Sequence, residues 1–85
     1  MATITIRYWA GAREAAGVAA EEFDAPTVDD ALRQAGTARG GDAEFTRVIG
    51  LCSFLLDGRR LGVEDRTRPL TGAVELEALP PFAGG

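Results

Sequence analysis

The sequence predicts a single α+β domain in which a mixed sheet packs against one principal helix. Residues 3–8 and residues 73–79 alternate polar and apolar side chains, which is typical of strands with one buried face. Residues 27–40 carry apolar side chains at helical spacing. Asp57-Gly58 is a strong signal for a two-residue hairpin turn. The chain of 85 residues is long enough for one domain, and the predicted order is two strands, a helix and three more strands.

The alternation in the first strand directs Ile4, Ile6 and Tyr8 toward the core. Residues 10–17 are rich in alanine and bracketed by glycine, so we expect a loop there that contains a single helical turn. Residues 18–24 are predicted to form a second strand that pairs with the first.

The principal helix is predicted to begin at Thr27, whose hydroxyl can cap free backbone N–H groups of the first turn. Asp29 and Asp30 follow in that turn, where the helix dipole favours negative charge. Gly40-Gly41 is expected to end the helix. Its apolar stripe consists of Val28, Ala31, Leu32 and Ala35.

The second half of the chain is predicted to complete the sheet. Residues 42–49 form a second short helical turn with Asp42 as its cap. Residues 51–56 form the most apolar strand, and residues 60–63 return after the hairpin turn. In the last strand one face carries Val74, Leu76 and Ala78, and the other carries Glu75, Glu77 and Leu79.

The composition argues against several classes of function. The net charge is −4 and there is no long basic run, so we expect no nucleic-acid partner. The chain contains no histidine and no lysine, which removes the commonest general base and excludes Schiff-base chemistry; we expect no metal and no bound cofactor. One cysteine, Cys52, allows no internal disulfide, and no apolar run approaches the length of a membrane span. We therefore expect a cytoplasmic protein that does not bind membranes.

The residues after the last strand carry the candidate chemistry. We assign residues 1–79 to the folded domain and residues 80–85, Pro-Pro-Phe-Ala-Gly-Gly, to a flexible tail. The carboxylate of Gly85 is ionised at neutral pH and resists nucleophilic attack, so it must be activated as an acyl-phosphate or acyl-adenylate before it carries a group. An ordinary frayed end is the alternative, and a Pro-Pro spacer directly after a strand argues against it. The residues assigned to threading into a partner's channel are Pro80, Pro81, Ala83 and Gly84.

Six residues are candidates for contact with a partner: Leu51, Leu55, Glu75, Glu77, Leu79 and Phe82. Phe82 is an aromatic residue that the prolines should carry off the sheet, and such residues are common binding hot spots. Leu51 and Leu55 share one face of the predicted strand and are interpreted as an exposed apolar patch, with shielding by loops as the alternative.

Two carboxylates and the cysteine have competing interpretations. Glu75 and Glu77 face away from the core, where they either form a solvated face or steer the chain onto a basic partner. Cys52 lies in the apolar strand with no basic neighbour in sequence to lower its pKa, so we expect a buried and inert thiol.

Several short motifs together indicate a family. The most specific is the ending at residues 79–85, and the internal motifs fall at residues 8–10, 13–17, 27–32, 57–58 and 70–72. With these motifs, nearly the whole chain resembles the ubiquitin-like sulfur carriers, in particular the MoaD-like small subunit of molybdopterin synthase. Asp57 stands where that family often has asparagine, and the acidic turn that often precedes its last strand is reduced here to residues 71–73.

The resemblance implies a β-grasp fold and a carrier role without catalysis by the chain alone. Gly85 would be adenylated with ATP by a ubiquitin-activating-type (MoeB-like) enzyme and converted into a thiocarboxylate. The tail would then enter the large catalytic (MoaE-like) subunit of molybdopterin synthase and give its sulfur to the pterin precursor of the molybdenum cofactor. The alternatives are a sulfur carrier for thiamin thiazole or cysteine biosynthesis, a ubiquitin-like protein modifier, and a non-covalent adaptor.

Overall fold

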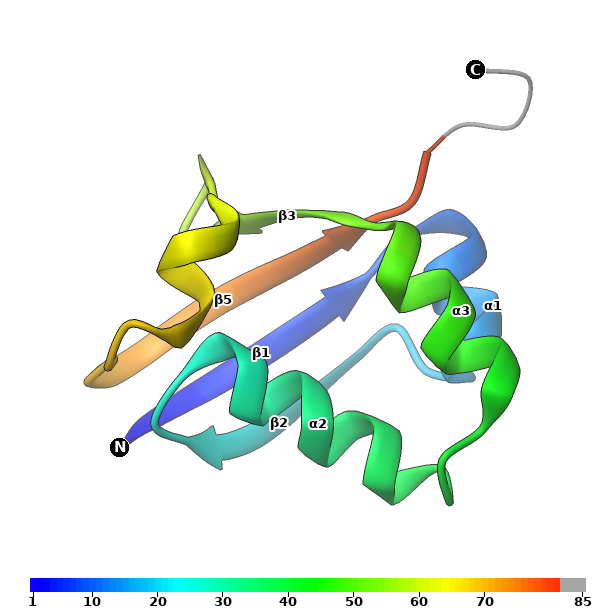
Figure 1. Ribbon diagram of the computed structural model, residues 1–85, viewed down its shortest axis with the longest axis horizontal. Helices are drawn as coiled ribbons and strands as arrows, with labels where there is room; N and C mark the ends of the chain where they lie inside the picture. Colours follow the sequence, from blue (N-terminus) through cyan, green and yellow to red (C-terminus); the bar gives the residue numbers. More distant parts are fainter. Residues whose placement is uncertain (82–85) are drawn as a thin grey trace.

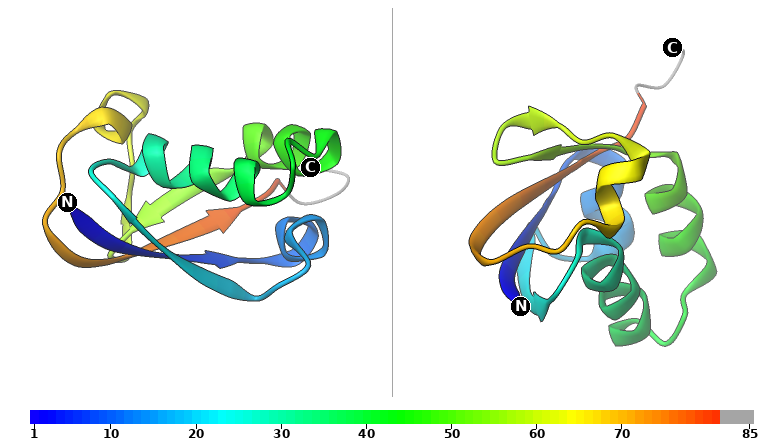
Figure 2. Two further views of the ribbon diagram at one scale, coloured as in Figure 1. Left: turned by 90° about the horizontal axis from the view of Figure 1, so that it is seen from below. Right: turned by 60° about the vertical axis from the view of Figure 1, so that its left-hand side comes forward.

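A computed structural model describes residues 1–81, which form a five-stranded sheet with helices on one of its sides (Figures 1 and 2). The strand order is β2-β1-β5-β3-β4, with β1 and β5 parallel and every other pair of neighbours antiparallel. This arrangement confirms the predicted α+β fold with a mixed sheet. The elements are β1 (Ala2–Tyr8), α1 (Ala10–Ala16), β2 (Ala20–Ala25), α2 (Val28–Ala38), α3 (Ala43–Leu51), β3 (Ser53–Leu56), β4 (Arg59–Arg60), the 3₁₀ helix η1 (Val63–Thr67) and β5 (Gly72–Leu79).

The core lies between the two central strands and the helices. The predicted alternation in β1 is confirmed, because Ile4, Ile6 and Tyr8 are all buried. In the parallel pair, Ile6 lies opposite Leu76, which is also fully buried. Phe45 of α3 packs its ring edge-on against Tyr8, with the ring centroids 5.8 Å apart. The apolar faces of both ends of the chain therefore meet in one core.

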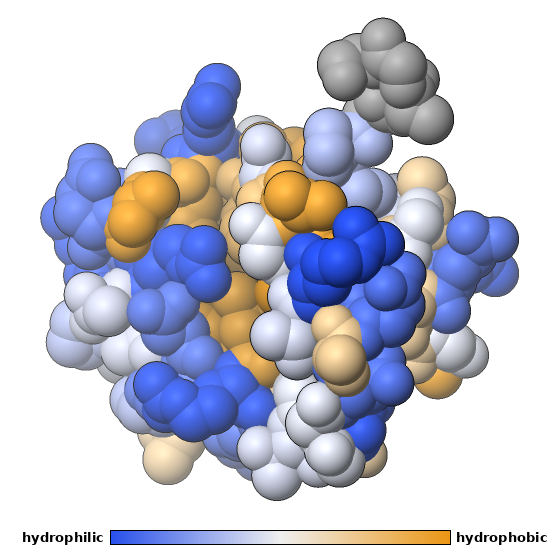
Figure 3. Space-filling model, turned by 45° about the vertical axis from the view of Figure 1, so that its right-hand side comes forward, coloured by the Kyte–Doolittle hydropathy of each residue, from blue (hydrophilic) through white to orange (hydrophobic). Residues whose placement is uncertain are grey.

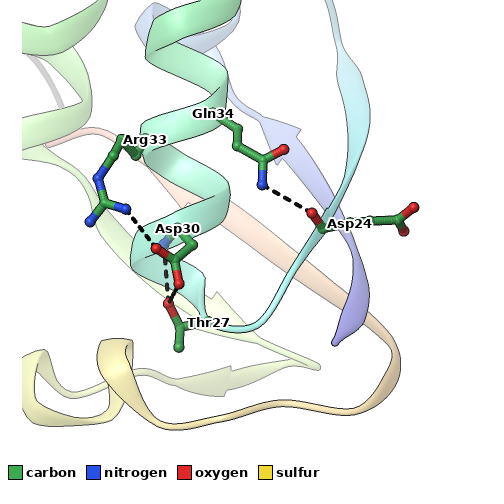
Figure 4. Close-up of polar contacts among 5 residues, drawn as sticks. All are labelled: Asp24, Thr27, Asp30, Arg33 and Gln34. Carbon is green, nitrogen blue, oxygen red and sulfur yellow. Dashed lines mark hydrogen bonds and ion pairs between the residues drawn. The ribbon is translucent and has the colours of Figure 1, made fainter.

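Helix α2 begins where its sequence predicts. The Thr27 hydroxyl accepts a hydrogen bond from the Asp30 backbone N–H at 3.1 Å and donates one to the Asp30 carboxylate at 2.8 Å (Figure 4). The helix runs through Gly36 and ends before Gly40-Gly41, both of which have positive φ. All four residues of the predicted apolar stripe are buried.

The segment after β1 differs from its prediction. Residues 10–16 form the full helix α1 in place of a loop with one turn. Ala12 is completely buried, and Gly17, with φ of 79°, ends the helix by donating its N–H to the Arg13 carbonyl. Tertiary packing and the glycine at the C-terminus therefore stabilise a helix that lacks a side-chain cap at its start.

The α3–β3 boundary also differs from the prediction. Asp42 caps α3 as expected, but the helix continues to Leu51, so β3 starts only at Ser53. The return strand after the Asp57-Gly58 turn is confined to Arg59–Arg60 and does not reach residue 63. Because a short apolar run fits a buried helix and a strand equally well, the pattern alone placed this boundary wrongly.

Candidate functional site

The predicted tail starts at the end of β5. Leu79, the last residue of β5, lies opposite Ser53, the first residue of β3. On the other side of β5, the Trp9 N–H donates to the Ala78 carbonyl at 3.2 Å. Pro80 is half-buried and Pro81 is exposed. The domain thus fixes the root of the tail between two neighbouring strands. The assigned roles of Phe82, Ala83, Gly84 and Gly85 fall on residues outside those that the structure describes.

The side of the sheet opposite the helices is here named the open face. It is formed by the strand residues that alternate with the buried ones. Glu75 and Glu77 lie on it as predicted, and so do Leu79 and Leu55. Leu55 lies directly opposite Glu77 and is half-buried. The residues of the open face that bear on the site are Arg7, Leu55, Glu75, Glu77 and Leu79.

Two residues that the sequence interpretation missed contact the carboxylates of this face. Trp9 is 44% exposed and donates its indole N–H to the Glu77 carboxylate at 3.1 Å. The Arg7 guanidinium lies 3.5 Å from the Glu75 carboxylate. Both residues could have been found from the sequence, because the alternation that buries Tyr8 directs its odd-numbered neighbours outward. The two carboxylates are therefore held by neighbours on the same face.

The predicted patch of Leu51 and Leu55 on one strand face is wrong. Leu51 is the last residue of α3 and is 56% exposed, whereas Leu55 belongs to β3. Leu51 precedes by two residues the Ser53 that pairs with Leu79. Leu51 therefore lies just before the strand that borders the end of β5, whereas Leu55 belongs to the open face.

Cys52 is not in a strand but directly follows α3, where it is half-buried. Its thiol donates a hydrogen bond to the Val48 carbonyl at 3.3 Å. Burial raises the pKa of the Cys52 thiol to about 11. The thiol is therefore protonated at neutral pH and is a poor nucleophile, as expected, although the predicted full burial is wrong because the residue is only half-buried.

The helical side contains a groove between α2 and α3. Its volume is about 510 Å³, and its apolar floor includes Leu32, Phe45 and Ile49. Figure 3 shows apolar residues recessed between charged ones on this side. The two arginines at its rim form ion pairs with aspartates, Arg33 with Asp30 and Arg66 with Asp29.

Within residues 1–81 there is no cluster of three or more side chains that could hold a metal ion. In the same range, none of the helices has the length and apolar character needed to cross a membrane. The open face and Trp9 adjoin the end of β5, where Leu79 is followed by Pro80 and Pro81.

Comparison with solved structures places this fold among known ones. The solution structure of small archaeal modifier protein 1 from Methanosarcina acetivorans matches over 100% of this chain and 98% of its own, with a TM-score of 0.81 and 24% identity. The same-named protein of Haloferax volcanii matches with a TM-score of 0.75 and 23% identity, over 96% and 100%. A chain from the complex of subunits 1 and 2 of molybdopterin-converting factor from Helicobacter pylori 26695 matches with a TM-score of 0.67 and 18% identity, over 98% and 99%.

No protein-family model and no curated protein sequence matches the chain. At identities below 25%, the structural matches establish the fold. The β-grasp architecture that the sequence resemblance implied is therefore confirmed.

Proposed function

From the β-grasp fold that this chain shares with MoaD-like and small archaeal modifier proteins, we propose that it is a sulfur carrier whose reactive group is the Gly85 carboxyl. The single observation that carries the proposal is the Pro-Pro-Phe-Ala-Gly-Gly segment that follows directly on β5, the central strand parallel to β1. The protonated state of Cys52 is in keeping with this role, because the carrier needs no thiolate of its own.

The chemistry requires two steps at Gly85. A ubiquitin-activating-type enzyme (MoeB-like) transfers AMP from ATP to the carboxylate and releases pyrophosphate. Hydrosulfide, or a donor that delivers sulfur at this oxidation level, then attacks the acyl carbon, displaces AMP and loses its proton, which leaves a thiocarboxylate. The absence of a Cβ on Gly84 and Gly85 leaves the reacting carbonyl accessible inside a narrow partner site.

The acceptor that we propose is the pterin precursor bound by a large catalytic subunit of the molybdopterin synthase type (MoaE-like). The matched Helicobacter pylori structure is a complex of subunits 1 and 2 of molybdopterin-converting factor, which supports a partner of this kind. We assign the open face and Trp9 as the surface that the large subunit contacts. Leu55 and Leu79 supply apolar area there, and the exposed ring of Trp9 supplies an aromatic anchor.

A second candidate function is covalent modification of other proteins. It is favoured by the likeness to two small archaeal modifier proteins. In this case an amine of a target protein attacks the adenylated Gly85 carbonyl, displaces AMP, loses a proton and forms an amide. Sulfur delivery to thiazole or cysteine synthesis and a non-covalent adaptor role stay as further alternatives.

Intact mass measurement of the protein purified from its cells tests the proposal. We expect a fraction whose mass corresponds to exchange of one oxygen for sulfur, with the change located at Gly85 by fragmentation. Gly85→Val should abolish this form while leaving the circular dichroism spectrum unchanged. Gly50→Val serves as the control, because a Cβ at Gly50 meets nothing within 4 Å. A protein that carries no thiocarboxylate when the activating enzyme, ATP and a sulfur source are supplied would contradict the proposal.

A further inference from the structure

Strand β2 is an outer strand of the sheet and pairs only with β1. Tyr8 donates its backbone N–H to the Ala19 carbonyl at 2.8 Å. The backbone groups of Ala19, and of every second residue after it in β2, therefore point toward β1. In an antiparallel ladder these residues alternate with residues whose N–H and C=O groups point away. The register then places the backbone groups of Ala20, Glu22 and Asp24 at the outer edge.

One side chain confirms this direction. The Gln34 amide of α2 donates to the Asp24 carbonyl at 2.9 Å, as Figure 4 shows, so that carbonyl does point away from β1. Within residues 1–81, no strand lies beside the N–H and C=O groups of Glu22. The edge therefore offers backbone groups to another extended chain, up to the point where Gln34 occupies it.

A groove adjoins this edge between β2 and α2. Its volume is about 500 Å³, and it is lined by Phe23, Pro26, Asp30, Arg33, Gln34, Thr37 and Ala38. Phe23 is half-buried and lies opposite the buried Ile4 in the β1–β2 pair, so its ring is on the helical side of the sheet. Arg33 is held by Asp30 at 2.6 Å. A side chain that enters the groove from an added strand thus meets the Phe23 ring beside an ion pair that is already satisfied.

The open-face side of the same edge is acidic. Glu22 and Asp24 are both exposed, and Thr3 donates a hydrogen bond to the Asp24 carboxylate at 2.9 Å. In the part of the chain that the structure describes, neither carboxylate has an arginine partner. Two β2 edges brought together would place like charges opposite one another, which disfavours pairing of this chain with itself.

We propose that the β2 edge and its groove bind an extended, basic segment of a partner protein by strand addition. Backbone groups of the segment bond to those of Ala20 and Glu22. Because side chains alternate along a strand, every second one enters the groove over Phe23, and the intervening lysines or arginines lie beside Glu22 and Asp24. This surface does not involve the Gly85 carboxyl, so it constitutes a second binding site.

The test is a titration of the ¹⁵N-labelled chain, followed by NMR, with an acetylated hexapeptide of alternating lysine and leucine. We expect shift changes in β2 and the groove residues of α2, and slower exchange of the Glu22 amide proton. A peptide of alternating glutamate and leucine should bind roughly tenfold more weakly. The double substitution Glu22→Arg with Asp24→Arg should reverse this preference, whereas Glu14→Arg, at an exposed position of α1, should not.

Modified peptides and a shortened chain provide a second set of probes, and none of them alters the β2 edge or its groove. N-methylation of the peptide amides that face the edge should abolish binding, and N-methylation of the intervening amides should not. A chain lacking Gly84 and Gly85 should bind the peptide as the full chain does, which separates this site from the carrier function. The proposal is overturned by a lack of binding, by shift changes centred on Leu55 and Leu79, or by equal binding of the two N-methylated peptides.

Discussion

Replacement of Arg39 by methionine tests what holds the helices onto the sheet. Arg39 follows α2, and its side chain is 14% exposed. The guanidinium donates to the Ala16 carbonyl at 3.0 Å and to the Ala35 carbonyl at 2.9 Å, and it lies 2.7 Å from the Glu21 carboxylate. Its carbon atom Cζ is 4.4 Å from the centroid of the Phe45 ring. One side chain thus joins α1, α2, α3 and β2.

The magnitude follows from the groups that the substitution leaves behind. Removal of one partner from a buried ion pair costs about 3–5 kcal/mol. The Glu21 side chain is 24% exposed, so water compensates part of this loss, and we expect about 3 kcal/mol. The total unfolding free energy of a domain of this size is about 4–13 kcal/mol. For a domain of this length the midpoint of thermal unfolding should fall by roughly 12–24 °C.

Urea unfolding followed by circular dichroism measures the change, since the midpoint should fall while the slope stays constant. A double-mutant cycle with Glu21→Gln isolates the ion pair: the second substitution removes the stranded charge and should restore about 1 kcal/mol or more. Glu21 also accepts a hydrogen bond from the Tyr8 hydroxyl at 2.6 Å, which glutamine can still accept through its carbonyl oxygen. A loss below about 1 kcal/mol for Arg39→Met would refute the assignment of Arg39 as the central contact.

Three further outcomes are expected. The pKa of the Cys52 thiol is raised from 9.0 to about 11, so at pH 8 it should react with iodoacetamide roughly a hundredfold more slowly in the folded protein than in urea. The rate in the folded protein should rise with pH up to about 11. Equal rates in the two states would contradict the burial of the thiol. Gly58→Ala forces a side chain into a φ of 81° and should cost about 1–2 kcal/mol of unfolding free energy, whereas Gly36→Ala, inside α2 with open space around its Cβ, should add about 0.5–1 kcal/mol. Leu55→Arg on the open face should weaken binding of the large subunit, measured by calorimetry, at least about tenfold, and Glu14→Arg should not; unchanged affinity would remove the open face from the proposed interface.

Elements with a periodic pattern and a capping residue could be predicted from the sequence. Thr27 and Asp42 mark the starts of α2 and α3 because each side-chain oxygen meets a backbone N–H of its own helix, which is a local event. The Asp57-Gly58 turn is equally local, since both residues adopt the positive φ that a tight hairpin requires. The alternation of polar and apolar residues in β1 likewise predicted the burial of Ile4, because side chains of a strand point to its two faces in turn.

Elements that depend on distant contacts could not be predicted in this way. Helix α1 is stabilised by burial of Ala12 and by the hydrogen bonds of Arg39 to the Ala16 carbonyl, 23 residues apart in sequence. Helix α3 ends at Leu51, where Cys52 takes an extended backbone conformation and donates its N–H to the Ile49 carbonyl, and the apolar run over residues 51–56 gave no signal for this change. The open face shows the same limit: alternation gives the outward direction of Trp9, but its hydrogen bond to Glu77 depends on the parallel pairing of β1 with β5.

The absence of lysine excludes one use of an activated Gly85 carboxyl, the linking of copies of this chain through lysine side chains. Amide formation needs an amine, and the side chains of these 85 residues supply none, so copies of the chain cannot be linked through their own lysines. Neither transfer of sulfur nor attachment to another protein needs an amine on the carrier, and both require that a partner recognise the domain and admit the tail. In the described residues, the open face and Trp9 lie beside the end of β5, and this is the surface that we propose for such recognition. A carrier that passes through the sites of successive enzymes also benefits from a raised pKa at Cys52, because a protonated thiol does not compete for the activated acyl group.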